Sequence, residues 1–322
     1  MKTIGLMTSG GDAPGMNAAI RAVARVAVGR GFRVLGFQRG YEGILQEQFQ
    51  EMDARSVSNI VHRGGTILKT ARSKEFLTLK GQKRAARSLD KLKVDGLVLI
   101  GGDGTFRGAM DLAKVWKGKL VGIPGTIDND LFGTDFTLGF DTAVNTAVEA
   151  IDKVRDTADA HERFFLIEVM GRHSGHIAIA VGFATGAEEI LIPEKAVDVR
   201  AMCQRLCAGR CRGKTSSIIV VAEGVVKGGA YRVAERLEKL SKNEYRVCIL
   251  GHIQRGGSPT AADRLLGTKL GSYAVDLLAR GQTGVMAGEV AGKLVATPLR
   301  RAIQNKKKLD GYLLTLHSKL SL

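Results

Sequence analysis

The stretch Gly96–Thr105 (GLVLIGGDGT) joins a run of apolar residues to a glycine-rich end that carries one aspartate. A short apolar run bounded by glycines is typical of a strand buried on both faces, as in a parallel sheet. The stretch Lys119–Asp130 (KLVGIPGTIDND) repeats this arrangement, because its apolar residues run into the loop 124–130. Ligands of open parallel sheets bind at the carboxyl ends of the strands, where both glycine-rich loops are expected.

The residue types in these two loops suit the transfer of a phosphoryl group. Glycines let backbone N–H groups approach phosphate oxygens without a side chain in the way. Aspartates supply a ligand for Mg²⁺ and a base beside the acceptor hydroxyl. Thr126, Asp128 and Asp130 alternate, which predicts three polar side chains on one side of an extended segment. The sequence therefore predicts phosphotransfer.

Strand-like runs alternate with helical patterns along most of the chain, which favours parallel βαβ units. A chain of 322 residues is long enough for two α/β domains or one large one. A change of domain is expected near residues 139–141, where the alternation restarts. The expected strands are 3–7, 33–37, 96–100, 119–123, 164–169, 190–192, 215–222 and 247–250, and the expected helices include 17–30, 107–115 and 141–158.

The chain is strongly basic, with 48 Lys and Arg residues against 32 Asp and Glu, and a formal net charge of +16. Nucleic-acid binding is the obvious interpretation of such a charge. Aromatic residues make up only 5 %, however, and no basic stretch is interleaved with them as single-strand binding requires. We therefore expect no nucleic-acid partner, and arginines that serve anionic substrates or the solvated surface.

The N-terminal residues and the apolar stretches favour a cytoplasmic protein without membrane contact. The chain begins with a strand-like run rather than a signal peptide, and the longest apolar stretch, near 177–187, is too short to span a bilayer. Cys203, Cys207 and Cys211 are spaced along one face of a predicted helix. We interpret them as small apolar packing residues rather than metal ligands.

Other loops that follow strand-like runs carry residues suited to phosphate and sugar. The loop 10–12 opens a helix, whose N-terminus attracts anions. Arg172 and Arg255 present paired donors to phosphate oxygens, and Glu223 suits sugar hydroxyls. The loop 101–105 lacks the third glycine of a dinucleotide-binding motif, and a phosphate-binding P-loop is missing as well.

In order and spacing, these loops resemble those of bacterial ATP-dependent 6-phosphofructokinases. The resemblance runs from residue 1 to about residue 305, and the motifs that carry it are 10–12, 101–105, 124–130, 170–172, Glu223 and 251–257. It implies two doubly wound, parallel-rich α/β domains, assembled as a homotetramer, with the active site in the cleft between the domains. The implied ATP-binding domain comprises 1–139 and 253–304, and the implied fructose 6-phosphate-binding domain comprises 140–252 and 305–322.

The resemblance also implies the reaction. ATP–Mg²⁺ phosphorylates fructose 6-phosphate at its 1-hydroxyl, giving fructose 1,6-bisphosphate and ADP in glycolysis. Asp128 is the implied base, with Thr126 and Asp130 beside it, and Asp103 is the implied Mg²⁺ ligand. Arg72 and Arg172 complete the implied catalytic residues. The implied nucleotide contacts are Gly11, Arg72, Ser73, Gly102, Asp103, Gly104 and Thr105.

A larger set of residues is implied to bind the sugar phosphate. Arg163 and Arg246 would come from a neighbouring subunit, so the active site would need the oligomer. The full set is Thr126, Asp128, Arg163, Met170, Gly171, Arg172, Glu223, Arg246, His252 and Arg255.

A regulatory nucleotide site is implied as well. Its residues are Arg21, Arg25, Arg55, Arg155, Glu188, Arg212 and Lys214. The chain departs from the family at Ala54, where an arginine is common, and at Lys74, where a proline is common. The choice between ADP and phosphoenolpyruvate as effector therefore stays open.

Three alternatives compete with this interpretation. A pyrophosphate-dependent phosphofructokinase tends to carry aspartate and lysine where this chain has Gly104 and Gly125. NAD and lipid kinases share the Gly-Gly-Asp-Gly-Thr motif but lack the loops 124–130 and 251–257. A basic nucleic-acid-binding protein would account for the charge but for none of the ordered motifs.

Overall fold

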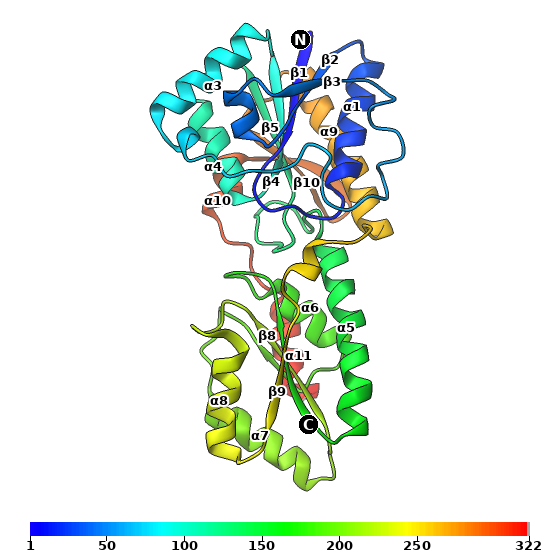
Figure 1. Ribbon diagram of the computed structural model, residues 1–322, viewed down its shortest axis with the longest axis vertical. Coiled ribbons are helices and arrows are strands. Elements are labelled where there is room, and N and C mark those ends of the chain that lie inside the picture. Colours follow the sequence, from blue (N-terminus) through cyan, green and yellow to red (C-terminus); the bar gives the residue numbers. More distant parts are fainter. Residues whose placement is uncertain (321–322) are drawn as a thin grey trace. The chain divides into compact units, whose positions relative to one another are not determined.

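The computed structural model describes residues 1–320, with the side chains of 317–320 excepted. The chain divides into two compact units, each built on its own sheet (Figure 1). The last two residues of the expected segment 305–322 lie outside the described residues. The first unit comprises Met1–Ile127, Leu131–Thr142 and Arg255–Lys307, and the second comprises Asp128–Asp130, Ala143–Gln254 and Lys308–Leu322.

The first unit contains a seven-stranded sheet in the order β11-β10-β5-β4-β1-β2-β3. Its five inner strands are parallel, and an antiparallel strand closes each edge. Strands β1 and β4 are buried along their whole length, as expected for strands with helices on both faces. The strands are β1 (Thr3–Thr8), β2 (Arg33–Phe37), β3 (Phe49–Met52), β4 (Gly96–Gly101), β5 (Lys119–Pro124), β10 (Val285–Val290) and β11 (Lys293–Pro298).

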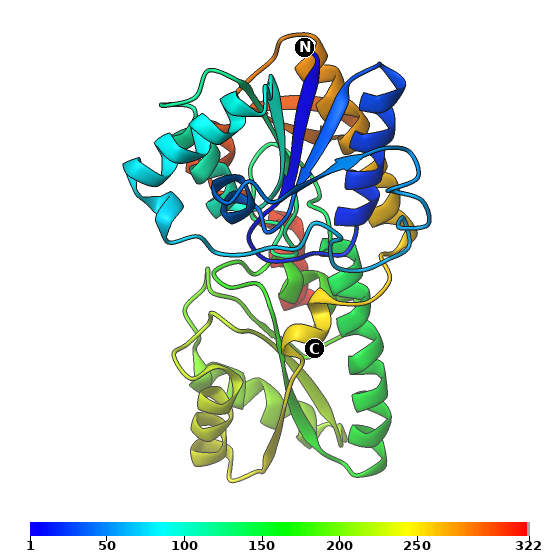
Figure 2. The same ribbon diagram turned by 45° about the horizontal axis from the view of Figure 1, so that its top comes forward.

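Helices cover both faces of this sheet (Figures 1 and 2). On one face α1 (Met16–Gly29) packs against α9 (Ala261–Ala279). The other face carries a continuous apolar core, in which Leu97 and Leu99 of β4 meet Phe106 of α4. The helices over that core are α2 (Tyr41–Leu45), α3 (Leu79–Lys91), α4 (Asp103–Leu112) and α10 (Leu299–Gln304), together with the short 3-10 turn η1 (Glu75–Leu77).

The second unit contains a four-stranded, fully parallel sheet in the order β7-β8-β6-β9. Helices α7 and α8 pack on one face, over a core that includes Leu166, Ile219 and Leu237. The strands are β6 (Phe164–Val169), β7 (Glu189–Leu191), β8 (Ser217–Ala222) and β9 (Tyr245–Ile249). The helices are α5 (Phe140–Ala160), which begins in the first unit, α6 (His176–Ala184), α7 (Val199–Cys211), α8 (Gly229–Ser241) and α11 (Gly311–Leu320), and the 3-10 turn η2 (Gly251–Arg255) follows β9.

The parallel βαβ units favoured by the alternating pattern are confirmed, and so is the doubly wound, parallel-rich architecture implied by the family resemblance. Two local expectations are wrong. The helix expected at 107–115 begins at Asp103, so the loop 101–105 is mostly the first turn of α4. Three strands were not expected: β3 and β11, which form the edges of the sheet, and the inner strand β10. β3 and β11 are mostly exposed or partly exposed, whereas β10 is buried over its first four residues.

The packing role assigned to three cysteines holds only for Cys203. This residue is buried beside Met202 and Leu206, whereas Cys207 and Cys211 are exposed. Each step of four residues turns about 40° beyond a full helical turn, so the later cysteines rotate off the buried face. Among the described residues, no helix combines the length and the apolar character needed to cross a membrane.

Candidate active site

The glycine-rich loops of the first unit meet where its strand order reverses. From β1 the chain continues to β2 on one side, whereas from β4 it continues to β5 on the other side. After β1 and after β4 the chain therefore turns in opposite directions, and the two loops begin side by side at the carboxyl edge of the sheet. Open α/β sheets bind ligands at such a place. The Ser9 amide donates to the Ile100 carbonyl oxygen (3.0 Å), and the Gly125 amide donates to the Gly101 carbonyl oxygen (3.0 Å). Three loops are thus joined at one edge.

Thr105 links this edge to the more distant segment that carries Ser73. Its hydroxyl donates to the Ser9 carbonyl oxygen (3.0 Å), and its own carbonyl oxygen accepts from the Tyr41 hydroxyl (2.7 Å). The Tyr41 ring stacks on Phe76, with ring centroids 3.8 Å apart. Ser73 accepts a hydrogen bond from the Phe76 amide (3.3 Å). Arg72 is exposed next to Ser73, so both expected nucleotide contacts are tied through Tyr41 to the start of α4.

Asp103 lies in the first turn of α4 and is partly exposed, with 44 % of its side chain accessible. Both carboxylate oxygens accept from Nε of Arg107, at 3.0 and 2.9 Å. This bond is the main reason why the pKa of Arg107 is raised. Mg²⁺ in nucleotide sites is held by one or two carboxylates together with phosphate oxygens. A partly exposed carboxylate beside three glycines fits that role.

The loop after β5 differs from the expected extended segment. A turn forms at Ile127–Asp128, and Asn129 has the left-handed φ of +50°. Asp128 is consequently buried, with 5 % of its surface exposed, whereas Asp130 is exposed. The prediction that Thr126, Asp128 and Asp130 line one side is therefore wrong, because the turn interrupts the alternation.

The two glycines that bear on the phosphoryl donor have different surroundings. A Cβ atom added to Gly104 would have no heavy atom within 4 Å. A Cβ atom added to Gly125 would lie 2.9 Å from Cε of Met16 and 3.0 Å from Cγ2 of Ile100. The space beside Gly104 is open, whereas the space beside Gly125 is filled by neighbouring side chains.

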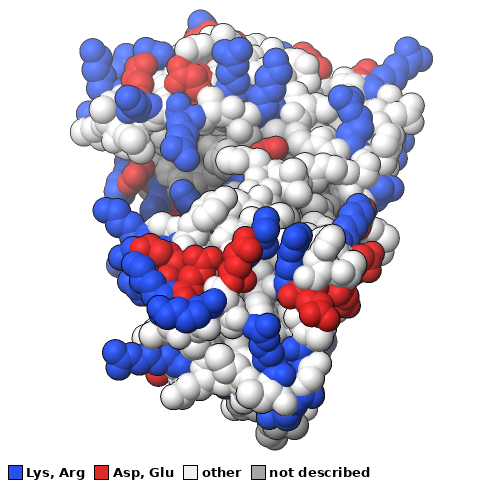
Figure 3. Space-filling view, turned by 60° about the horizontal axis from the view of Figure 1, so that its bottom comes forward, with Lys and Arg blue, Asp and Glu red and all other residues white. Residues whose placement is uncertain are grey.

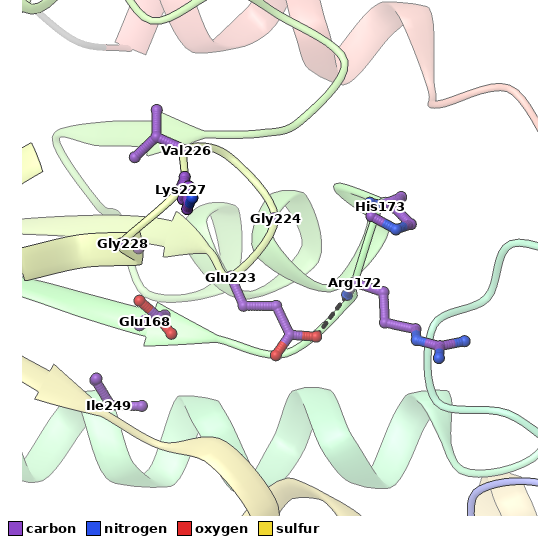
Figure 4. Close-up of a pocket in the computed structure, with 10 residues that line it drawn as sticks. Glu168, Arg172, His173, Glu223, Gly224, Val226, Lys227, Gly228 and Ile249 are labelled. Atoms are coloured by element: carbon purple, nitrogen blue, oxygen red, sulfur yellow. Dashed lines mark hydrogen bonds between the residues drawn. The ribbon is translucent and has the colours of Figure 1, made fainter. Parts of the chain in front are cut away.

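The second unit contains a cavity of about 540 Å³ at the carboxyl ends of β6 and β8 (Figure 4). The Arg172 amide donates to Oε1 of Glu223 (2.7 Å), which joins the loops that follow the two strands. Arg172 has the left-handed φ of +52°, and its guanidinium extends away from Glu223 (Figure 4). The structure brings the Arg172 backbone to the Glu223 carboxylate, while the role of both residues in sugar binding stays a prediction. His173 and Lys227 also line the cavity, although sequence reasoning gave neither a role there.

Gln254 organises the other predicted sugar-binding loop. It is fully buried, and its Oε1 accepts from the Met170 amide (2.8 Å) while its Nε2 donates to the Ala143 carbonyl oxygen (3.3 Å). His252, two residues earlier in η2, is exposed. Gln254 belongs to the motif 251–257, but the sequence analysis assigned it no role. A polar residue is usually exposed, so its burial could not be predicted from the sequence.

Arg255 belongs to the first unit and lies against the loop after β1. Its Nη1 donates to the Asp12 carbonyl oxygen (3.2 Å), and a Cβ atom on Gly11 would lie 2.7 Å from the same nitrogen. A guanidinium therefore flanks the glycine that was predicted to contact the nucleotide. This arrangement places positive charge at the loop, as an anionic ligand requires.

Arg163 and Arg246 lie apart from the other predicted sugar-phosphate residues. Arg163 directly precedes β6, and Arg246 is paired with Phe165 near the start of the same strand. Met170 and Arg172 follow the far end of β6. At about 3.3 Å per residue, the two ends of the segment are roughly 20 Å apart. Within one chain these arginines do not join the cavity that Glu223 lines.

Four of the predicted regulatory residues gather in the second unit. Glu188, Arg212 and Lys214 line a cavity of about 70 Å³, and the Lys214 ammonium pairs with Glu188 (2.6 Å). Arg155 donates to the Thr185 carbonyl oxygen (2.5 Å), one residue before the lining residue Gly186. The other three, Arg21, Arg25 and Arg55, belong to the first unit.

On the face of the molecule drawn in Figure 3, the basic side chains do not form one continuous patch. Figure 3 shows Lys and Arg side chains scattered over the visible surface, with groups of Asp and Glu among them. Some of the basic side chains are engaged in surface ion pairs, such as Lys239 with Glu235 (2.8 Å). This distribution is the one expected for a solvated surface.

Comparison with known proteins identifies the family of the chain. The phosphofructokinase family model matches residues 3–278. ATP-dependent 6-phosphofructokinase 1 of Thermus thermophilus is 56 % identical over 322 residues, with both chains covered completely. The ATP-dependent 6-phosphofructokinase of Bacillus subtilis is 50 % identical, also over the whole of both chains.

Solved structures agree with these relatives. The chain superimposes on a phosphofructokinase of Pichia pastoris with a TM-score of 0.89 at 33 % identity, and on that of Saccharomyces cerevisiae with 0.87 at 34 %. Each superposition includes 99 % of this chain, but only 38 % of the Pichia pastoris chain and 47 % of the Saccharomyces cerevisiae chain. A pyrophosphate-dependent phosphofructokinase of Marinobacter aquaeolei, at 22 % identity and a TM-score of 0.83, shares the fold. The family match and the full-length identities together show that this chain belongs to the phosphofructokinase family.

Proposed function

We propose that the chain transfers the γ-phosphoryl group of ATP to the 1-hydroxyl of fructose 6-phosphate. The observation that carries this proposal is the buried carboxylate of Asp128, in a loop tied to the glycine-rich loop that begins α4. The full-length relatives named ATP-dependent 6-phosphofructokinase support the same donor and the same sugar. The products are fructose 1,6-bisphosphate and ADP.

The residues divide into roles that follow from their chemistry. Asp128 accepts the proton of the attacking hydroxyl, and that oxygen forms the new bond to the γ-phosphorus as the bond to the β,γ-bridging oxygen breaks. Arg72 neutralises charge on the transferred group, while Thr126 and Asp130 flank the base. Phosphoryl transfer depends mainly on such positioning and charge neutralisation, without a protein nucleophile.

Asp103 would hold Mg²⁺, with the phosphates of ATP as its other ligands. The bound ion would neutralise phosphate charge and keep the polyphosphate in one orientation. Gly11, Ser73, Gly102, Gly104 and Thr105 would contact the nucleotide. Arg107, which holds the Asp103 carboxylate in this structure, would stay beside it as a second cation.

The sugar phosphate would be held largely by the second unit. Glu223, Arg172 and the backbone at Met170 and Gly171 line or border the cavity of Figure 4 and suit the hydroxyls of the sugar. His252 and Arg255, with Arg163 and Arg246 of a neighbouring subunit, would bind its 6-phosphate. This allocation calls for an oligomer, because one chain alone does not bring the two arginines to its own cavity, and the family resemblance makes that oligomer a homotetramer.

Three further assignments belong to the same proposal. Arg155, Glu188, Arg212 and Lys214, with Arg21, Arg25 and Arg55 of another subunit, would form a regulatory site for ADP or phosphoenolpyruvate. The expected division is nucleotide binding by the first unit and sugar binding by the second, with the enzyme in the cytoplasm. A pyrophosphate-dependent reaction is the alternative, and the open space beside Gly104 favours ATP over it.

A coupled assay tests the reaction. Formation of fructose 1,6-bisphosphate is measured with fructose 6-phosphate and Mg²⁺, with ATP or pyrophosphate as donor, and with ADP or phosphoenolpyruvate added as effectors. The expected result is turnover with ATP and almost none with pyrophosphate. Turnover with pyrophosphate but not with ATP would overturn the choice of donor. If neither donor supported turnover that depends on fructose 6-phosphate, the proposed reaction would be wrong.

A further inference from the structure

Asp263, in the first turn of α9, is a buried carboxylate for which the proposed reaction has no use. Only 1 % of its surface is exposed. Its Oδ1 accepts from the Gly139 amide (2.8 Å), and its Oδ2 accepts from the amide (2.9 Å) and the hydroxyl (2.5 Å) of Thr142. A buried carboxylate is costly unless hydrogen bonds replace its water, so three donors at one side chain indicate a built arrangement.

The carboxylate lies at the start of α5, whose first amides need acceptors. Gly139 directly precedes α5, and Thr142 is in its first turn. Acidic groups at a helix N-terminus satisfy these amides and interact favourably with the helix dipole. The aspartate that does so here comes from another helix, 121 to 124 residues away in the sequence.

The starts of α5 and α9 hold each other in place. The Thr260 hydroxyl caps α9 by accepting from the Asp263 amide (3.3 Å), and it donates to the Asp141 carboxylate of α5 (2.6 Å). The Thr260 amide donates in turn to the Thr142 hydroxyl (3.1 Å). Removing one member of this network therefore loosens two helix ends at once.

Hydrogen bonds connect this network to the loop that leads to Asp128. The Leu138 amide donates to the Pro124 carbonyl oxygen (2.9 Å), and the Thr137 hydroxyl donates to the Thr126 carbonyl oxygen (2.5 Å). Segment 137–139 therefore supports residues 124–126 directly. A hydrogen bond that holds Gly139 in place therefore also holds residues 124–126, which lead to Asp128.

Close packing at Gly139 and Gly15 connects this hydrogen-bond network to the loop that follows β1. Gly139 has a φ of +93°, and a Cβ atom there would lie 2.7 Å from Cβ of Ala13 and 3.1 Å from Cγ2 of Ile127. Gly15, which caps α1 with a φ of +93°, would bring a Cβ atom within 3.3 Å of Cβ of Asp263. The two glycine-rich loops thus pack against the residues that Asp263 holds.

We propose that Asp263 is a positioning residue for phosphoryl transfer, which sets the loop 124–128 through Gly139 and Thr142. It touches no substrate, and it acts by holding segment 137–142 against the carbonyl oxygens of Pro124 and Thr126. This inference rests on the proposed role of Asp128 as the base. Its effect is on the geometry of the reacting groups rather than on substrate affinity.

The test compares the full-length enzyme with its Asp263→Asn variant. Asparagine keeps the shape, but its NH₂ group replaces one acceptor oxygen and faces a donor. We expect kcat to fall by about 10- to 100-fold while both KM values change by less than about threefold, since misplacement by about 1 Å costs up to about 10²-fold. Hydrogen exchange should accelerate in peptides that cover 124–142 and stay unchanged in β4 and β6.

Three further variants sharpen the test. Asp276→Asn changes an aspartate of the same helix that pairs with Arg30 at the surface, and it should leave kcat and exchange unchanged. Thr142→Val removes one of the three hydrogen bonds to Asp263 and the acceptor of the Thr260 amide, and it should lower kcat by a smaller factor. Thr142→Ser keeps the hydroxyl and should retain the activity. The threonine pair keeps the proposal testable if Asp263→Asn does not fold.

Unchanged kcat in Asp263→Asn or Thr142→Val would overturn the inference. Faster exchange throughout the protein, with both KM values rising, would overturn it too, because it would show a general loss of stability. The base assignment is tested separately: if Asp128→Asn kept its turnover, the assignment would fail. The exchange data would still report whether Asp263 holds residues 124–142.

Discussion

Arg163 and Met170 flank the same strand, β6, and lie beyond its opposite ends. Both were expected to bind one sugar phosphate, yet about 20 Å of extended chain separates them. Arg246 lies near Arg163, because its strand pairs with the start of β6. Two arginines at one end and the cavity lined by Glu223 at the other suit the proposed site shared by neighbouring subunits.

Mixed oligomers test this sharing. Arg163→Ala or Arg246→Ala should each raise the fructose 6-phosphate requirement by about 30-fold or more, as expected when a guanidinium is removed from a bound dianion. Oligomers that combine either variant with Glu223→Ala should regain activity, because some sites then draw Glu223 from one chain and both arginines from the other. Oligomers of the two arginine variants should regain none. Activity that stays absent in every verified hybrid would place all three residues in one chain's site.

Asp128→Asn should abolish most turnover. A base that acts in the transition state contributes about 10²- to 10⁴-fold to kcat, while the KM for fructose 6-phosphate should stay within a few fold. Initial rates over a range of both substrates measure the two effects. Near-native kcat would assign the proton transfer to another group.

Gly104→Asp should impair the use of ATP without loss of stability. The added side chain enters open space in the first turn of α4, where an acidic residue is tolerated, but it repels the phosphates. We expect kcat/KM for ATP to fall while the melting temperature stays unchanged. Gly104→Ala is the matched control and should retain activity. Gly125→Lys should lower the melting temperature as well, since its Cβ atom meets Met16 and Ile100.

Tyr41→Phe should loosen the link between the start of α4 and the segment that carries Arg72 and Ser73. The ring still stacks on Phe76, but the Thr105 carbonyl oxygen loses its hydrogen bond. We expect unfolding by urea to show a loss of about 1 kcal/mol, with a higher KM for ATP. A KM for fructose 6-phosphate that rose equally would argue against a local effect.

The stability of the protein should depend on pH through Asp263. Burial raises the pKa of its carboxyl group, although hydrogen bonds from Thr142 and Gly139 oppose the rise and Asp141 adds to it. The folded protein therefore binds this proton more tightly than the unfolded chain does. The resulting stabilisation is complete below the ordinary aspartate pKa of about 3.9 and is lost as the pH rises through the folded value. The unfolding free energy of the wild type, relative to Asp263→Asn, should fall over that range in denaturant titrations. An increase would mean that the pKa is lowered.

The sequence was sufficient for the features that depend on neighbouring residues. The apolar runs before Gly101 and Pro124 predicted β4 and β5, and the glycines after them marked the carboxyl edge, although residues 103–105 there belong to α4 rather than to a loop. Arg172 and Glu223 were predicted for one ligand, and a hydrogen bond joins them. These features follow from local composition, which a single sequence contains.

Features that depend on distant residues were not predictable. Nothing in the sequence pairs Tyr41 with Thr105, or Asp263 with Gly139, because such contacts arise only when the sheet brings its loops together. The turn at Asp128 was missed for another reason. Alternating polar residues are equally compatible with an extended segment and with a turn that has a left-handed residue, here Asn129.

The separation of Asp263 from Gly139 has a consequence for synthesis of the protein. The ribosome adds about 5 to 20 residues per second, so the carboxylate emerges several seconds or more after the glycine it must hold. The block Ala143–Gln254 forms most of the second unit and is complete by then, whereas the first unit still lacks Arg255–Lys307. A nascent chain can therefore fold most of its second unit early, but it cannot become a working kinase until nearly its whole length has been translated.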